Sequence, residues 1–280
     1  MKRIAIQGVS GAFHEIAARN YFNEEIGIIP CHTFKDLFDT IKKDPEIIGV
    51  MAIENTIAGS LLSNHKLLSE SNLKVVGEYK LRISHCIAAL PDQSIDDITE
   101  AHSHPIALMQ CEDFLDKHKH LKSVENADTA LAAKEIAEGK IRGRAAICST
   151  LAAQMYGLNI LEKEIETNKR NFTRFLIISD KWTSDELLKN VIVNKSTLMF
   201  TLPHEEGSLA KVLSVLSFYH LNLTKIQSLP IIGREWEYQF YITVNFDNYT
   251  RYKQGIAAIE PLLKDFKVLG EYQSADTIKA

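Results

Sequence analysis

A hydroxyl, a guanidinium and two aromatic rings lie within the five residues Asn171-Phe172-Thr173-Arg174-Phe175, just before the apolar run Leu176-Ile177-Ile178. The apolar run is typical of a strand. The threonine hydroxyl donates and accepts hydrogen bonds, and the guanidinium is a permanent cation whose shape fits carboxylates. The aromatic side chains can exclude water around both groups. The stretch therefore predicts a site that binds an acid and acts on a hydroxyl, although an arginine at a strand start is also common on ordinary surfaces.

Small or polar residues also stand at four points where a predicted strand meets a predicted helix. These junctions are Gly8-Val9-Ser10-Gly11, Glu54-Asn55-Thr56-Ile57-Ala58-Gly59-Ser60, Ser103-His104-Pro105 and Cys148-Ser149-Thr150. Backbone N–H groups at helix starts favour anions, and ligands of open α/β sheets lie at the carboxyl ends of strands. Several junctions that meet beside Arg174 would suit a small ligand with more than one carboxylate. Each junction alone is also the ordinary way to begin a helix.

Two of these regions carry polar side chains of further interest. Glu54 and Asn55 close an apolar strand, where a carboxylate is expected only beside a partner or in a cleft. Gln110 lies one to two turns into the helix that follows the third junction. As ordinary alternatives, the first two are turn residues and Gln110 is an exposed helix residue. The ten histidines show no metal-ligand spacing, and no glycine-rich phosphate loop is complete, so we expect neither a metal nor a nucleotide cofactor.

Short apolar strands alternate with amphipathic helices up to about residue 180, which predicts an α/β domain with mostly parallel strands. The expected elements are strands over 3–7, 47–53, 80–89 and 145–148 and helices over 12–22, 60–69, 106–117 and 128–138, with Asp128 and Ser149 as helix caps. The segments 77–84 and 162–173 are placed to cross between two lobes. We therefore expect a two-lobed domain with a cleft.

The pattern changes after a polar stretch, 180–196, in which we expect a linker with one helical turn. Beyond it the sequence predicts strands over 197–202, 221–229, 236–245 and 267–272 and helices over 207–219 and 252–263. This βαββαβ order is the ferredoxin-like unit. Its open sheet often pairs with a second copy of itself.

Bulk composition limits the class of protein. The chain has 280 residues, 45% of them hydrophobic and 24% charged, with a net charge of -4, as is ordinary for a globular protein of about two domains. It has no basic stripe for nucleic acid and no apolar run of membrane-spanning length. Its four cysteines are scattered, which argues against disulfides and a zinc site. We predict a cytoplasmic protein without nucleic-acid or membrane partners.

Five motifs follow one another along the chain: Gly8…Gly11-Ala12-Phe13, Glu54-Asn55-Thr56-Ile57-Ala58-Gly59-Ser60, Ser103-His104-Pro105…Gln110-Cys111, Asp128-Thr129-Ala130 and Asn171-Phe172-Thr173-Arg174-Phe175. In this order they resemble the prephenate dehydratase family, and the downstream unit resembles an ACT regulatory domain. The resemblance covers nearly the whole chain. It is to the single-activity form, because no chorismate mutase helix bundle precedes the first motif.

The resemblance implies an α/β fold with a two-lobed, type II periplasmic-binding-protein-like catalytic domain over 1–182. Lobe 1 would comprise about 1–79 and 163–182, and lobe 2 about 80–162. A ferredoxin-like ACT domain would follow over 197–275. Compared with the family, the first glycine turn departs from the pattern, since Val9 and Ala12 stand where proline and threonine are frequent.

The resemblance also implies a reaction. Prephenate is a dianion whose ring hydroxyl leaves as water and whose ring carboxylate leaves as carbon dioxide, giving phenylpyruvate in phenylalanine biosynthesis. Aromatisation drives this reaction, so no cofactor is expected. Thr173 would assist departure of the hydroxyl and Arg174 would hold a carboxylate. The implied catalytic residues are Thr173, Glu54, Asn55 and Gln110, and the implied substrate-binding residues are Arg174, Ser103, Phe175, Phe172, Gly11 and Ser149.

For the ACT unit, the resemblance implies L-phenylalanine as the effector and a homodimer or homotetramer. The implied effector-binding residues are Gly207, Ser208, Leu209, Gln227 and Ser228. The family's Gly-Ala-Leu and Glu-Ser-Arg-Pro stretches read here Gly207-Ser208-Leu209 and Gln227-Ser228-Leu229-Pro230. The loss of a glutamate and an arginine leaves the effector open.

Three other functions are compatible with parts of this sequence. A non-enzymatic protein that binds small acids would use the same helix starts, but it has no need of the Thr173 hydroxyl beside Arg174. A dehydratase that prefers arogenate would differ only in recognising an ammonium group where prephenate has a ketone. A regulatory ACT protein with a degenerate catalytic half is disfavoured by the intact catalytic motifs.

Overall fold

The computed structural model describes residues 1–275 and separates into two compact units. Unit 1 comprises Met1–Lys43, Ile47–Gly59 and Lys80–Phe175, and unit 2 comprises Asp44–Glu46, Ser60–Tyr79 and Leu176–Ala280. Within the described range, no helix is both long enough and apolar enough to span a membrane.

The N-terminal strands belong to a sheet with the strand order β2-β1-β3-β11-β5. Its strands are β1 (Lys2–Gln7), β2 (Ile26–Cys31), β3 (Ile48–Asn55), β5 (Lys74–Arg82) and β11 (Phe172–Ser179), with the short β4 (Gly59–Ser60) paired to β3. In unit 1, β1 pairs in parallel with both β2 and β3. The helices α1 (Phe13–Phe22) and α2 (Phe34–Lys43) contact these strands, which explains why the first six residues of β3 are all buried.

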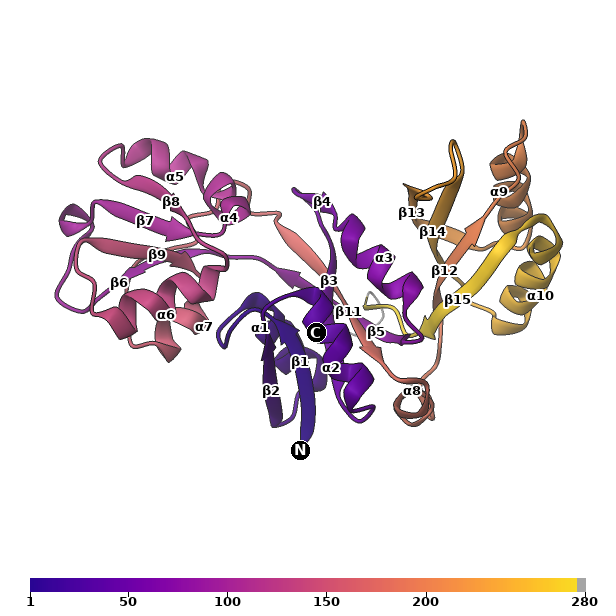
Figure 1. Ribbon diagram of the computed structural model, residues 1–280, viewed down its shortest axis with the longest axis horizontal. Helices are drawn as coiled ribbons and strands as arrows, with labels where there is room; N and C mark the ends of the chain where they lie inside the picture. The colour runs from indigo at the N-terminus through magenta and orange to yellow at the C-terminus, as the bar shows by residue number, and fades with distance from the viewer. Residues whose placement is uncertain (276–280) are drawn as a thin grey trace. The chain divides into compact units, whose positions relative to one another are not determined.

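The second sheet of unit 1 has the order β10-β6-β9-β7-β8. Its strands are β6 (Cys86–Ala89), β7 (Glu100–Ser103), β8 (Lys122–Glu125), β9 (Arg144–Cys148) and β10 (Asn159–Lys163). Helices α6 (Thr129–Gly139) and α7 (Thr150–Met155) lie on one face, and α4 (Pro105–Gln110) and α5 (Glu112–Lys117) lie on the other (Figure 1). The strand period of two sends Cys86 and Ala88 into the first layer and Ile87 and Ala89 into the second.

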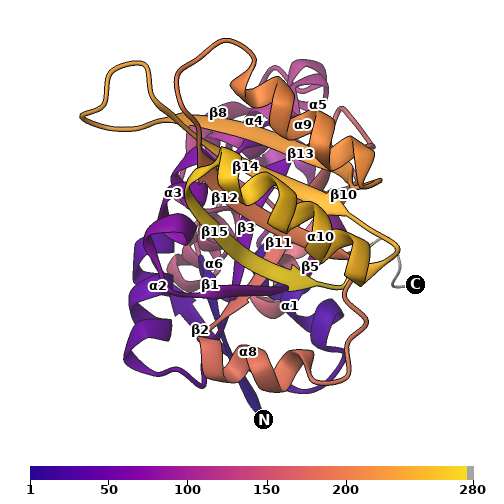
Figure 2. The same cartoon turned by 90° about the vertical axis from the view of Figure 1, so that its right-hand side faces the viewer.

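Unit 2 contains the predicted βαββαβ order, as β12 (Lys195–Thr201), α9 (Ser208–Phe218), β13 (Asn222–Pro230), β14 (Tyr238–Asn245), α10 (Tyr249–Ile259) and β15 (Lys264–Tyr272). The strands form an antiparallel sheet in the order β13-β14-β12-β15. Both helices lie on one face of this sheet (Figure 2) and bury a core that includes Phe200, Val212 and Tyr252. Unit 2 also contains α3 (Leu62–Glu70) and α8 (Lys181–Leu188).

Several predicted elements differ from the structure. The pentapeptide does not precede a strand, because β11 already begins at Phe172 and so includes Thr173 and Arg174. The expected helix over 106–117 is two helices that meet at Cys111, and the strand over 80–89 is divided between β5 and β6. The expected single turn in 180–196 is the eight-residue helix α8, which Asp180 caps. The strands of the second sheet are mixed in direction, because β6 runs antiparallel to β9 and β10.

An ion pair inside unit 2 is fully buried. Lys195 Nζ lies 2.7 Å from Glu78 Oε1, and the two side chains are 3% and 0% exposed. The same Glu78 oxygen also accepts hydrogen bonds from the hydroxyl of Ser274 and the backbone N–H of Ala275. Removing one partner of such a pair leaves an uncompensated charge in the interior.

We therefore predict that Lys195→Ala lowers the free energy of unfolding by about 3–5 kcal/mol, the usual effect of breaking a buried pair. The matched control is Lys66→Ala in the same unit, which removes an exposed pair with Glu70 and changes stability by about 0.5 kcal/mol or less. Urea denaturation followed by circular dichroism, with hydrogen exchange of β12 peptides, measures both variants. Equal losses in the two variants would contradict a special role for the buried pair.

Candidate active site

Asn55, at the end of β3, is held in one orientation by the turn that follows it. Its side-chain oxygen Oδ1 accepts hydrogen bonds from the backbone N–H groups of Ile57, at 2.9 Å, and Ala58, at 2.8 Å. The amide nitrogen Nδ2 must therefore face the other way. It donates to the side-chain oxygen of Asn171 at 2.7 Å and to the hydroxyl of Thr173 at 3.0 Å.

The donor and acceptor roles of two more side-chain amides follow from this orientation. Because Asn171 accepts from Asn55 with its oxygen, its Nδ2 is the group that donates to Gln110 Oε1, at 2.9 Å. His85 Nε2 lies 3.0 Å from the same Gln110 oxygen. Gln110 Nε2 in turn faces Asn55 Oδ1 at 3.5 Å, a long contact that closes the ring. The four polar side chains and His85 form what we call the amide ring: Asn55, His85, Gln110, Asn171 and Thr173.

The ring determines what the Thr173 hydroxyl can do. Its oxygen accepts the bond from Asn55, and no acceptor among residues 1–275 takes its proton. Thr173 is 9% exposed, and Asn171 and Gln110 are 0% and 6% exposed, so these dipoles act in a poorly hydrated place. The hydroxyl is thus presented as a hydrogen-bond donor.

Strand alternation separates the predicted site residues into two faces. Glu54 and Arg174 lie on the opposite faces of their strands from Asn55 and Thr173, and the Arg174 guanidinium is 3.1 Å from the Glu54 carboxylate. The structure thus places Glu54 and Arg174 together, and Asn55, Gln110 and Thr173 together. The substrate contact predicted for Arg174 stays a prediction.

The predicted aromatic residues also differ in their surroundings. Phe172 is 40% exposed, whereas Phe175 is 1% exposed and packs edge-on against His14, with the ring centroids 5.0 Å apart. Burial lowers the pKa of His14 to about 4, so this ring is neutral at pH 7. Phe175 therefore packs in a buried and uncharged environment.

Gly11, Ser149 and Ser103 occupy buried joints. The Ser149 hydroxyl donates to the carbonyl of Gly11 at 2.6 Å and accepts from the N–H of Ala152, so it caps α7 as predicted. Gly11 has a φ of +89°, and a Cβ there would lie 2.7 Å from Ala152 Cα. Ser103 is fully buried and donates to the carbonyl of Ile147, so its hydroxyl already has an acceptor inside the sheet.

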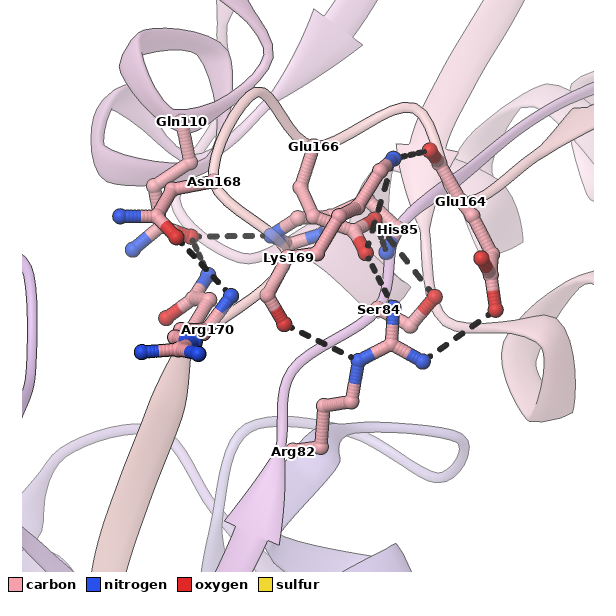
Figure 3. A network of polar contacts seen from close by, with 10 residues as sticks. Arg82, Ser84, His85, Gln110, Glu164, Glu166, Asn168, Lys169 and Arg170 are labelled. Carbon is pink, nitrogen blue, oxygen red and sulfur yellow. Dashed lines mark hydrogen bonds and ion pairs between the residues drawn. The ribbon is translucent and has the colours of Figure 1, made fainter.

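Two chain segments join the two sheets: one links β5 to β6, and the other links β10 to β11. Glu166 lies in the second segment and connects it to the first beside the amide ring. This buried carboxylate accepts from the guanidinium of Arg82 at 3.1 Å and from the backbone N–H of His85 at 2.9 Å. The Arg82 guanidinium lies between Glu164 and Glu166, and Gln110 lies next to the cluster (Figure 3). Sequence reasoning missed His85 and Glu166, because neither belongs to a local pattern. It did quote Asn171 but assigned it no role.

The residues predicted to bind an effector lie in unit 2. Gly207 precedes α9 with a φ of +76°, followed by Ser208 and Leu209 in the first turn of that helix. Gln227 and Ser228 lie on β13, which pairs only with β14 among the described strands. The Gln227 amide donates to the carbonyl of Ser228. No group of three or more potential metal ligands occurs in residues 1–275.

Comparison with known proteins identifies the family. The family model described as prephenate dehydratase matches residues 4–183. The chain belongs to the prephenate dehydratase family. Its activity is the dehydration and decarboxylation of prephenate to phenylpyruvate, which makes it a hydro-lyase. The bifunctional chorismate mutase/prephenate dehydratase of Escherichia coli (strain K12) is 31% identical over 282 residues, covering 99% of this chain and 72% of the relative.

Solved structures show the same fold. A prephenate dehydratase from Arthrobacter aurescens in complex with L-Phe has a TM-score of 0.86 at 24% identity, covering 99% of this chain and 92% of the other. A protein described as GqqA, a novel type of quorum quenching acylase, has a TM-score of 0.87 at 28% identity, covering 97% and 98%. Within the family, the mixed α/β fold with open sheets predicted from the sequence is confirmed.

The contact at Gly11 yields a prediction about the joint between α1 and α7. Gly11→Ala should lower the free energy of unfolding by about 3 kcal/mol, because a left-handed conformation costs about 1–2 kcal/mol and overpacking against Ala152 adds about 1–3 kcal/mol. Gly157→Ala is the control, since its φ is +65° but nothing lies within 4 Å of the added Cβ, and it should cost only the strain. Chemical denaturation compares the two, and an equal loss would show that the contact adjusts freely.

Proposed function

We propose that Thr173 donates the hydrogen bond that helps the ring hydroxyl of prephenate to leave. The observation that carries this proposal is the direction of the Asn55–Thr173 bond. Because Thr173 accepts from Asn55 Nδ2, its own proton is available to a substrate oxygen. A threonine hydroxyl is too weak an acid to give up its proton unaided, so it acts as a positioned donor to the negative charge that develops on the leaving oxygen.

The chemistry fits neutral donors around the leaving hydroxyl. The prephenate dianion takes up one proton and becomes the phenylpyruvate monoanion, carbon dioxide and water. Formation of the aromatic ring drives both bond cleavages, so the protein has to orient the substrate and stabilise the leaving oxygen. Asn55 and Gln110 orient the substrate through the amide ring, together with the buried Asn171.

The other predicted residues keep their proposed tasks, with one addition. Arg174 would hold a substrate carboxylate, Phe172 and Phe175 would keep water away from the leaving carboxylate, Ser103 would orient the substrate, and Gly11 and Ser149 would contact it. The ion pair of Glu54 with Arg174 adds a second task, because it joins β3 to β11 one residue away from Asn55 and Thr173. It would hold these two side chains in register.

Thr173→Val tests the proposal. This nearly isosteric change removes the hydroxyl, and we expect kcat to fall by about 10²–10⁴-fold, the usual contribution of a positioned proton donor, in a protein with an unchanged circular dichroism spectrum. Thr173→Ser keeps the hydroxyl and should stay within about tenfold of the native kcat. The measurement is the absorbance of phenylpyruvate formed from prephenate. Near-normal turnover in Thr173→Val would remove this residue from the mechanism.

Hydrolysis of an amide is the second function that the comparisons raise, through GqqA. An acylase needs an activated nucleophile with a base that takes its proton. Thr173 accepts a hydrogen bond from Asn55, and no base accepts its proton within the described residues, which favours the dehydratase role. Chromatography of the products formed from prephenate, arogenate and an N-acyl amide separates the three activities, because they yield phenylpyruvate, phenylalanine, and a free acid with an amine, respectively. Amide cleavage without formation of phenylpyruvate would overturn the proposal.

For unit 2 we propose an ACT domain over 197–275, following the catalytic domain over 1–182, which regulates it by binding L-phenylalanine in a homodimer or homotetramer. Support comes from the observed βαββαβ order and from the L-Phe bound to the structurally similar Arthrobacter aurescens protein. The cytoplasmic location and the single-activity form stay predictions.

Restoring the family's charges on β13 tests the effector. We predict that Gln227→Glu combined with Leu229→Arg tightens L-phenylalanine binding about tenfold or more, because hydrogen bonds to charged groups contribute about 1.5–3 kcal/mol. Gln227→Glu with Ile226→Arg is the control, since Ile226 and Leu229 lie on opposite faces of the strand. Calorimetry and inhibition of turnover measure the effect. No binding by native or restored protein would leave unit 2 without this effector.

A further inference from the structure

We propose that His85 is a positioning residue of the reaction: the proton on its Nε2 fixes the orientation of the Gln110 side-chain amide, and so the direction of the whole amide ring. The inference deepens the proposed function and rests on it, since it concerns the same ring. His85 itself contacts Gln110 and not Thr173, so it acts through the amides.

The side-chain oxygen of Gln110 is an acceptor that two donors share. Gln110 Oε1 lies 3.0 Å from His85 Nε2 and 2.9 Å from Asn171 Nδ2. A carbonyl oxygen only accepts hydrogen bonds, so Nε2 of His85 must carry the proton. The two bonds use both lone pairs of this oxygen. The Gln110 NH₂ group is thereby turned toward Asn55 Oδ1, and its second N–H has no acceptor in the described part of the chain.

The other ring nitrogen of His85 is placed where a proton would be unfavourable. Nδ1 of His85 is buried and has no hydrogen-bond partner within residues 1–275. A proton on Nδ1 would be a buried donor without an acceptor, which is unfavourable. Burial also lowers the pKa of His85, although the bond to Gln110 and the charge of Glu166 act in the opposite direction. His85 is therefore neutral, with its single proton on Nε2.

The imidazole is held rigidly in this position. The backbone N–H of His85 donates to Glu166 Oε2 at 2.9 Å, and the ring packs edge-on against Phe13 with centroids 5.2 Å apart. Glu166 is buried and also accepts from Arg82 (Figure 3). The segments that join the two sheets thus fix the position of the His85 imidazole, and His85 in turn orients the Gln110 amide.

The proton on His85 Nε2 determines which end of the Gln110 amide faces the substrate. Without the proton on Nε2, the Gln110 amide is held only by Asn171. It can then flip, so that its oxygen and nitrogen exchange positions. Its oxygen would then face Asn55 Oδ1 and a dianionic substrate, and both contacts are repulsive. The donor on His85 keeps an N–H group on that side.

Three substitutions separate the donor from the ring. His85→Gln places an amide N–H near the position of Nε2 and should retain kcat within about threefold. His85→Phe keeps an aromatic ring but has no donor, and His85→Asn carries its donor too close to the backbone to reach Gln110. Both should lower kcat about tenfold, the usual effect of one neutral hydrogen bond. Circular dichroism and the thermal midpoint check that each variant folds.

A double-mutant cycle with Gln110→Ala decides whether His85 acts through Gln110. We expect His85→Phe to lower kcat about tenfold in the native background and by less than about twofold in Gln110→Ala. An equal loss in both backgrounds, or a folded His85→Phe protein with native kcat, would overturn the proposal. A loss in His85→Gln as large as in His85→Phe would overturn it too. Failure of the Thr173 proposal is measured separately, because Thr173→Val would then retain turnover while the His85–Gln110 coupling persists.

Discussion

Two backbone N–H groups determine the chemistry of this site. Those of Ile57 and Ala58 bind the side-chain oxygen of Asn55, which leaves the Asn55 nitrogen as a donor. Every later bond follows from that choice, because an amide that accepts on one side must donate on the other. Asn171 therefore donates to Gln110, and Thr173 accepts from Asn55. Backbone conformation in one turn thus sets the direction of the Thr173 hydroxyl.

The pairing of β3 with β11 places Asn55 beside Thr173. Thr56, next to Asn55, donates its N–H to the carbonyl of Phe172, and its hydroxyl accepts the N–H of Phe172. These two bonds fix the register, and a slip of one residue would exchange the faces of all side chains beyond it. Thr173 would then exchange places with Arg174. The relative positions of the site residues therefore depend on the register of β3 against β11.

Local pattern was enough to predict much of this protein. The caps at Asp128 and Ser149 and the βαββαβ order of unit 2 depend on neighbouring residues, and the structure contains them. The division into faces was not predicted, because it required the start of β11 to be known within one residue. His85 was missed for a different reason. It lies 25 residues from Gln110, and only the tertiary fold shows which atom its ring meets.

A site made of neutral amides suits a reaction that already has a large driving force. The fixed charge of Arg174, proposed to hold a substrate carboxylate, would bind substrate and transition state alike, which lowers KM without accelerating the bond cleavage. Oriented dipoles that are buried and already in place stabilise the charge that appears only as the hydroxyl leaves. Such dipoles are useful only while none of them can turn around. A bond from the backbone at Asn55 and one from the His85 imidazole at Gln110 prevent that at these two amides.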